Sequence, residues 1–149
     1  MRKSKINIPG FKIGTAENRE GLTGVTVILA PDGGATAGVD VRGCAPGTRE
    51  TDLLDPRKTV QKIHAVVLSG GSAFGLEAAS GCVKYLAEQG VGFPIGNVCV
   101  PIVCSAVLFD LMIGDEKAYP DLLMGYEAAK SASSEFLSGC NGAGTGATV

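Results

Sequence analysis

Clusters of glycine between apolar runs constrain this chain more than any other feature of its sequence. It contains 22 glycines in 149 residues, about twice the usual share, and they follow no collagen-like period. Glycine permits tight turns and close backbone contacts. We therefore expect short buried strands and closely packed helices, joined by tight turns, in a single domain that covers residues 1–149.

Composition and charge exclude several classes of protein. Hydrophobic residues make up 45% of the chain and charged residues 19%, as in globular proteins. The formal net charge of −2 argues against a nucleic acid or a membrane surface as partner, because both attract basic patches. No apolar stretch is long enough to span a bilayer, and the first residues lack the apolar core of a signal peptide. We expect a cytoplasmic protein.

The cysteines and the single histidine do not form the pattern of a metal site. None of the five cysteines belongs to a CxxC pair, and His64 is the only histidine in the sequence. We therefore expect no bound metal. In a cytoplasmic protein the cysteines are expected to be free thiols rather than disulfides.

Hydrophobic periodicity predicts strands and helices in a mixed order. Strands are expected at 25–30, 36–42 and 64–68, the first two forming a hairpin around the turn at 31–34. The clearest helix covers about 73–89 and ends at Gly90, with Gly75 and Gly81 allowing close packing. We also expect a short helix at 56–62, an apolar stretch over 98–111 split near Cys104 and Ser105, and a helix from Pro120 to about Ser133. We expect the strands at 25–29 and 66–68 to expose apolar edges, left unpaired by strands that lie outside this chain.

The strand, glycine turn and helix at 64–89 leave three chemical interpretations open beside a simple tight turn. A phosphate loop is disfavoured, because Leu76 and Glu77 stand where a lysine and a hydroxyl residue are needed. A nucleophile elbow at Ser72 lacks its final glycine, and His64 opens the strand at its far end. A backbone site for an anion or oxyanion is the third, because glycines at the start of a helix expose N–H groups.

A second glycine run, from Gly142 to Ala147, has the G-x-G-x-x-A spacing of a dinucleotide-binding loop. No strand clearly precedes this run, and too few residues follow it for the required helix. The dinucleotide interpretation therefore fails, and the run is more typical of an interrupted motif than of a natural terminus.

Three segments together resemble one family: GLTGVTVILAPDGGATAGVDVRGCAPGTRETDLLDP (21–56), HAVVLSGGSAFGLEAASG (64–81) and NGAGTGATV (141–149). They are similar to the DmpA-type peptidase family, which includes L-aminopeptidase/D-esterases, β-peptidyl aminopeptidases and nylon-oligomer hydrolases. The resemblance implies an αββα sandwich, as in N-terminal nucleophile hydrolases but with different connectivity, and as in ornithine acetyltransferase. It also implies that this chain holds an incomplete, N-terminal portion of the α-chain.

The resemblance also implies a mechanism. A precursor cleaves itself before a Ser or Thr beyond Val149, and the freed α-amine then acts as base for that hydroxyl. Expected substrates are the N-terminal residues of peptides, amides or esters, and no cofactor is expected. Expected partners are the missing C-terminal (β-chain) portion and further copies, in a homo-oligomer of αβ units.

The resemblance places no catalytic residue within this chain. Residues expected to line the substrate pocket or to support an oxyanion are Gly70, Gly71, Ser72, Phe74, Phe109, Gly142, Ala143 and Gly144. Phe109 stands where the nylon hydrolases place a pocket tyrosine, so a mechanism that needs that phenol is in doubt. The two glycine segments are expected to share one cleft. The alternative is a small non-catalytic domain that binds an anion or a protein partner through these glycine turns.

Overall fold

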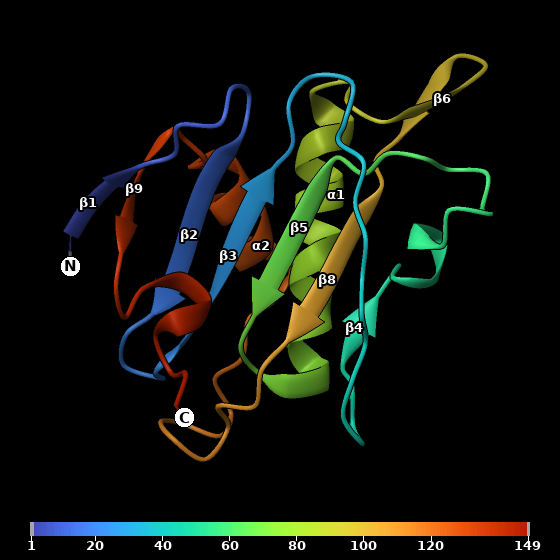
Figure 1. The fold of residues 1–149 in the computed structure, drawn as a ribbon. Coiled ribbons are helices and arrows are strands. Elements are labelled where there is room, and N and C mark those ends of the chain that lie inside the picture. Colours follow the sequence, from blue (N-terminus) through green and yellow to red (C-terminus); the bar gives the residue numbers. More distant parts are fainter. Residues whose placement is uncertain (1, 149) are drawn as a thin grey trace.

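The two most apolar runs of the sequence form the central strands of a five-stranded sheet. The structure is a computed structural model and describes residues 2–148. The strands are β2 (Lys12–Asn18), β3 (Thr23–Leu29), β4 (Thr48–Arg49), β5 (Ala65–Ser69) and β8 (Val103–Val107). Their order in the sheet is β2-β3-β5-β8-β4. β5 and β8 are parallel, and the other neighbours are antiparallel (Figure 1).

Two helices, α1 (Ala78–Glu88) and α2 (Leu122–Lys130), cover one face of this sheet (Figure 1). The 3-10 helix η2 (Ser72–Glu77) leads into α1. Alternate residues of β3 and β5, such as Val25, Val27 and Val67, are fully buried against the helices. Burying the apolar side of each element in this way is the main stabilising contribution of the fold.

Glycine lets the two helices approach each other closely. A Cβ atom on Gly81 of α1 would lie 1.9 Å from the carbonyl oxygen of Leu122, and one on Gly125 of α2 would lie 1.9 Å from that of Ala78. The expected packing role of Gly81 is therefore confirmed. Gly90 follows α1 with φ +68°, the left-handed conformation that ends helices.

Two smaller sheets flank the main one. β1 (Arg2–Lys5) pairs with β9 (Glu135–Ser138), and β6 (Phe93–Ile95) pairs with β7 (Val98–Val100) in a hairpin that projects from the body (Figure 1). The 3-10 helices η1 (Asp52–Leu54) and η3 (Gly142–Gly144) complete the chain.

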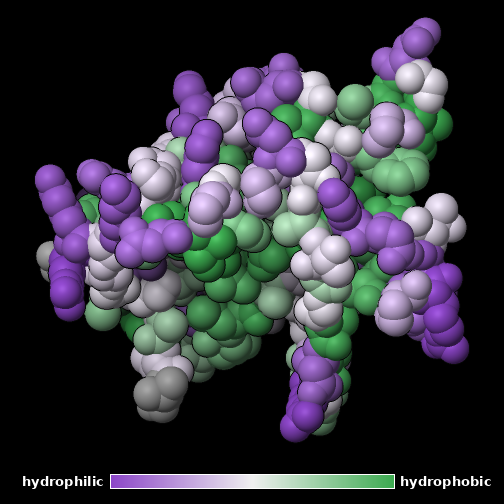
Figure 2. Space-filling view, turned by 45° about the horizontal axis from the view of Figure 1, so that its top comes forward, coloured by the Kyte–Doolittle hydropathy of each residue, from purple (hydrophilic) through white to green (hydrophobic). Residues whose placement is uncertain are grey.

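The second face of the sheet carries no α-helix among residues 2–148, and the short 3-10 helix η3 packs on it beside Thr26 of β3. It presents the residues that alternate with the buried ones, including Ile28, Val66 and Leu68, the last of which is 39% exposed. Figure 2 shows hydrophobic residues gathered in the middle of the molecule, with hydrophilic side chains around them. We call this surface the open face. One sheet with helices on one side is half of the predicted αββα sandwich.

Three predictions of local structure are wrong. Residues 36–42 form no strand, because β2 and β5 occupy both sides of β3, and the turn at 31–34 directs the chain away. Residues 56–62 form no helix. Asp55 accepts hydrogen bonds from the backbone and side chain of Arg57, so the chain turns there. The apolar stretch at 98–111 is interrupted at Pro101, which lacks an N–H donor, and not at Cys104 and Ser105, which lie inside β8.

The predicted apolar edges are also wrong. β3 and β5 are central strands with a partner on each side. The exposed apolar surface is a face of the sheet rather than the edge of a strand.

The helix expected from Pro120 begins at Leu122. It follows Asp121, whose carboxylate accepts a 2.8 Å hydrogen bond from the backbone N–H of Met124.

Candidate functional site

The two glycine segments of the sequence lie together at one end of the sheet. The backbone N–H of Gly70 donates to the carbonyl of Gly24 at 2.9 Å. A Cβ on Gly24 would lie 2.3 Å from the carbonyl oxygen of Gly142, so η3 packs directly on the start of β3. We call this region, formed by Gly70–Phe74 and Gly142–Gly146 around Gly24, the glycine edge. Both segments stand on the same side of the molecule, as a shared cleft requires.

The backbone N–H groups at six of the predicted site positions already have partners within the chain. The pairs are Gly70 with Gly24 O, Gly71 with Asp110 Oδ1, Ser72 with Leu108 O, Gly142 with Glu17 Oε2, Ala143 with Thr26 Oγ1, and Gly144 with Asn141 O. An oxyanion could use these donors only if the internal bonds were broken. Their visible role is to fix the shape of the two segments. A contribution to the substrate pocket stays a prediction.

A buried carboxylate that sequence reasoning missed lies at the glycine edge. Asp110 is 3% exposed. Its Oδ2 accepts a 2.7 Å hydrogen bond from the hydroxyl of Thr23, and its Oδ1 accepts a 2.6 Å hydrogen bond from the backbone N–H of Gly71. The sequence signal for Asp110 is its place directly after an apolar run. An acidic side chain that is buried at such a place needs hydrogen-bond partners.

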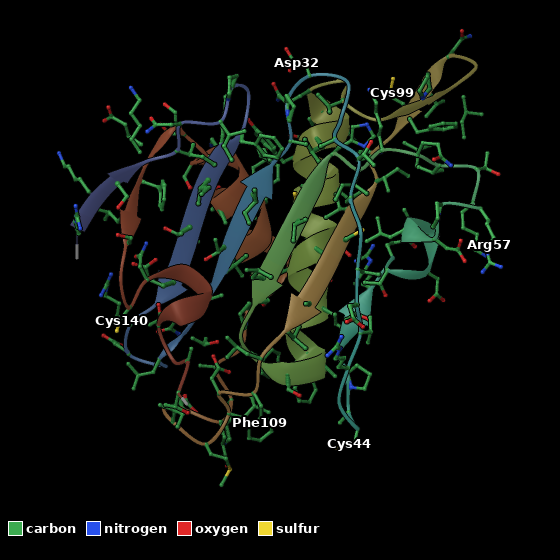
Figure 3. The ribbon with its side chains drawn as sticks, viewed as in Figure 1. Asp32, Cys44, Arg57, Cys99, Phe109 and Cys140 are labelled. Atoms are coloured by element: carbon green, nitrogen blue, oxygen red, sulfur yellow. The ribbon has the colours of Figure 1, made fainter. Side chains whose placement is uncertain are left out.

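Exposed aromatic rings border the glycine edge. Phe74 is 56% exposed, and its ring stacks on that of Tyr119, with 4.6 Å between the centroids and 18° between the planes. Tyr119 also packs against the turn, since a Cβ on Gly71 would lie 2.6 Å from the Cβ of Tyr119. Phe109 is 61% exposed and lies at the same end of the molecule as the C-terminal segment (Figure 3). These rings offer apolar contact area beside the glycine edge.

Ser72 and His64 are not brought together. Ser72 begins η2 with φ +53°, beyond the end of β5. His64 is buried before the start of the same strand, where its Nδ1 accepts a 3.1 Å hydrogen bond from the N–H of Ile102. The five residues of β5, about 17 Å of extended chain, and the two glycines after it lie between them. Burial lowers the pKa of His64. The imidazole is therefore a structural acceptor and gives Ser72 no base.

We expect Ser72→Ala to leave the activity of the native protein within about tenfold of wild type, roughly 1.4 kcal/mol of barrier. The reason is that the Ser72 hydroxyl has no hydrogen-bonded base among the described residues, since His64 bonds to Ile102 and Asp110 bonds to Gly71 and Thr23. The measurement is kcat/KM on an aminoacyl p-nitroanilide, with Ser72→Gly as a control that relieves the left-handed backbone. A thousandfold loss in Ser72→Ala but not in Ser80→Ala, a serine of α1, would make Ser72 a catalytic residue.

Two of the cysteines are buried thiols. Burial raises the pKa of the Cys82 thiol to about 12, and it also raises that of Cys104, whose thiol donates to the carbonyl of Glu50. No three His, Cys, Asp or Glu side chains converge in the way a metal ion would need, within residues 2–148. In the same part of the chain no helix has the length and apolar character to cross a membrane.

The chain is similar in sequence to hydrolases. Its residues 5–149 match Peptidase family S58. An uncharacterized aminopeptidase of Mycobacterium bovis is 48% identical over 121 residues, which cover 81% of this chain and 35% of that protein. A 6-aminohexanoate-oligomer endohydrolase of an Agromyces species is 37% identical over 146 residues, 97% of this chain and 38% of that protein. The chain therefore spans little more than a third of the length of these relatives.

Solved structures share the fold. A protein from Pyrococcus horikoshii OT3 has a TM-score of 0.75 at 22% identity, covering 95% of this chain and 44% of that one. A Burkholderia β-aminopeptidase has a TM-score of 0.68 at 19% identity, with coverage of 93% and 41%. The ornithine acetyltransferase of Mycobacterium tuberculosis has a TM-score of 0.52 at 15% identity, with coverage of 97% and 78%. These likenesses confirm the predicted fold class. The match over residues 5–149 leads to the family conclusion: the chain belongs to Peptidase family S58.

Proposed function

We propose that this chain is the N-terminal part of a DmpA-type aminopeptidase or amidohydrolase, whose nucleophile lies outside residues 1–149. One observation carries the proposal. The glycine edge is formed, yet no serine–base pair lies beside it among residues 2–148. The described residues of the glycine edge give Ser72 neither a histidine nor a carboxylate partner. The names of the relatives, an aminopeptidase and an oligomer endohydrolase, support amide hydrolysis as the reaction.

The open face supports the proposal that parts of the protein outside residues 1–149 complete the fold. An apolar sheet face is stabilised when another layer covers it. The two relatives, the Pyrococcus protein and the Burkholderia β-aminopeptidase are more than twice as long as the part that matches this chain. We propose that the rest of the α-chain and the β-chain supply the second sheet of the sandwich, packed on Ile28, Val66 and Leu68.

In this proposal the glycine edge forms one wall of the substrate pocket. Phe74 and Phe109 contact the side chain of the N-terminal residue of the substrate, because their exposed rings border this edge. A Ser or Thr released by self-cleavage attacks the amide carbonyl, and its own α-amine takes the hydroxyl proton and passes it to the leaving amine as the amide C–N bond breaks, which gives the acyl-enzyme. Water then hydrolyses the acyl-enzyme. A homo-oligomer of αβ units in the cytoplasm completes the proposal.

Binding of an anion by the glycine turns is the weaker candidate. It would use the backbone N–H groups of Gly70 to Ser72 and Gly142 to Gly144, and those groups are donated within the chain.

The native protein is the material for the test. We expect denaturing gels and mass spectrometry to show two fragments, the second beginning with Ser or Thr. We also expect release of p-nitroaniline from aminoacyl p-nitroanilides, or cleavage of β-dipeptides or 6-aminohexanoate oligomers. Substituting the first residue of the second fragment by Ala should abolish both cleavage and turnover. An uncleaved native protein, or a cleaved one without turnover on all of these substrates, would contradict the proposal.

A further inference from the structure

Asp110 connects three separate segments at the glycine edge. It follows β8, it accepts the hydroxyl of Thr23 at the start of β3, and it accepts the N–H of Gly71 after β5. Thr23 is also fully buried. Each oxygen of the carboxylate therefore holds a different strand terminus, in a place shielded from water where such bonds are strong.

The turn held by Asp110 has a backbone that needs support. Gly71 has φ +79°, and the next residue, Ser72, has φ +53°, which is costly for a residue with a Cβ atom. Gly70 fits closely on the carboxylate, because a Cβ at that position would lie 2.0 Å from Asp110 Oδ2. Removing the acceptor for Gly71 would leave a buried N–H without a partner and would release this turn.

Asp110 also contacts the second glycine segment. A Cβ on Gly146 would lie 3.0 Å from the Cβ of Asp110 and 1.9 Å from the carbonyl oxygen of Leu22. Gly146 is thus seated between the acid and the chain just before Thr23. The same side chain fixes the Gly70–Phe74 turn by hydrogen bonds and borders the Gly142–Gly146 segment by packing.

We propose that Asp110 is a positioning residue for amide hydrolysis: it holds the Gly70–Phe74 turn in register with the Gly142–Gly146 segment, so that the two walls of the pocket keep a fixed separation. This inference rests on the proposed function. It assigns Asp110 no contact with substrate and no proton transfer. A displacement of about 1 Å between such walls can lower a rate by about a hundredfold.

The test compares Asp110→Ala with Asp110→Asn in the native protein. Asn keeps an acceptor for Gly71 and can donate its amide to Thr23, so kcat is expected within about fivefold of wild type. Ala removes both bonds, and kcat is expected to fall about tenfold to a hundredfold, while KM changes less than about threefold. Amide hydrogen exchange at Gly71 should accelerate in Asp110→Ala and not in Asp110→Asn.

Two further variants serve as controls. Asp115→Ala removes another carboxylate that accepts a backbone N–H, that of Lys117, on an exposed turn, and it should leave kcat and Gly71 exchange unchanged. If Asp110→Ala fails to fold, Thr23→Val removes only the hydroxyl bond and should lower kcat by a smaller factor, with Thr23→Ser restoring it.

The outcomes separate the inference from the proposed function. A folded Asp110→Ala with wild-type kcat, or one with unchanged exchange at Gly71, overturns the inference. A loss in Asp110→Asn as large as that in Asp110→Ala also overturns it, because the charge and not the bonding would then matter. A wild-type protein without turnover contradicts the proposed function, and exchange at Gly71 then decides whether Asp110 holds the turn.

Discussion

A protein limited to residues 1–149 is expected to hydrolyse no aminoacyl amide, p-nitroanilide or β-peptide above background. The reaction needs a Ser or Thr hydroxyl with a base in reach. Within the described residues, Ser72 lacks such a base, and the one histidine is buried at the other end of β5. The measurement is p-nitroaniline release at high protein concentration, with the cleaved native protein as the positive control.

The same protein should self-associate, because on the open face Leu68 would be exposed to water and Ile28 and Val66 would be partly exposed. Size-exclusion chromatography with light scattering gives the mass. Co-expression of the following segment should restore both solubility and turnover. Turnover by residues 1–149 alone that disappears when one of their own side chains is replaced would contradict the proposed location of the nucleophile. A stable monomer would contradict the proposed role of the open face.

Gly81→Ala is expected to lower the free energy of unfolding by about 1–2 kcal/mol in net terms. Helix propensity alone predicts a gain of about 1 kcal/mol. The added Cβ would however lie 1.9 Å from the carbonyl oxygen of Leu122, so that α1 and α2 must move apart, and overpacking of this kind costs about 1–3 kcal/mol or more. Urea unfolding of the native protein gives the change, as a shift in midpoint at constant slope.

Gly38→Ala is the matched control for this experiment. A Cβ at Gly38 would meet no atom of residues 2–148 within 4 Å, and the backbone there has no left-handed φ. Its replacement should therefore change stability by less than about 0.5 kcal/mol. A Gly81→Ala protein that is more stable than wild type would show that the helices can separate freely and that the close approach is not required.

The buried elements of this fold could be predicted from the sequence, and the edges could not. β3, β5 and α1 carry strong apolar patterns, because each is covered by neighbours. β1 and β2 are rich in polar and charged residues, as is typical of strands near a sheet margin. No apolar pattern therefore predicted these two strands. The hairpin of 25–30 with 36–42 was predicted wrongly, because the turn at 31–34 has the residues that are typical of hairpin turns. Which strand becomes the neighbour is decided by the whole sheet.

The glycines of the sequence predicted the position of the candidate site, but its hydrogen bonds were not predicted. The sequence places the two glycine segments, but their N–H groups find partners such as Glu17 and Thr26, far away in the chain. Asp110 was missed for the same reason, since its two partners, Thr23 and Gly71, lie 87 and 39 residues away. No local pattern records a contact that only the folded sheet creates.

The pairing of β1 with β9 has a consequence for synthesis. Arg2 faces Ser138, and Lys5 faces Glu135, so β1 leaves the ribosome about 130 residues before its partner. At about 5–20 residues per second, it waits roughly 7 to 27 seconds without a strand to pair with. The lysines and the arginine of β1 keep the unpaired strand hydrated and repel other nascent copies. β1 is thus made long before it can pair, and its own charged side chains protect it from association during translation.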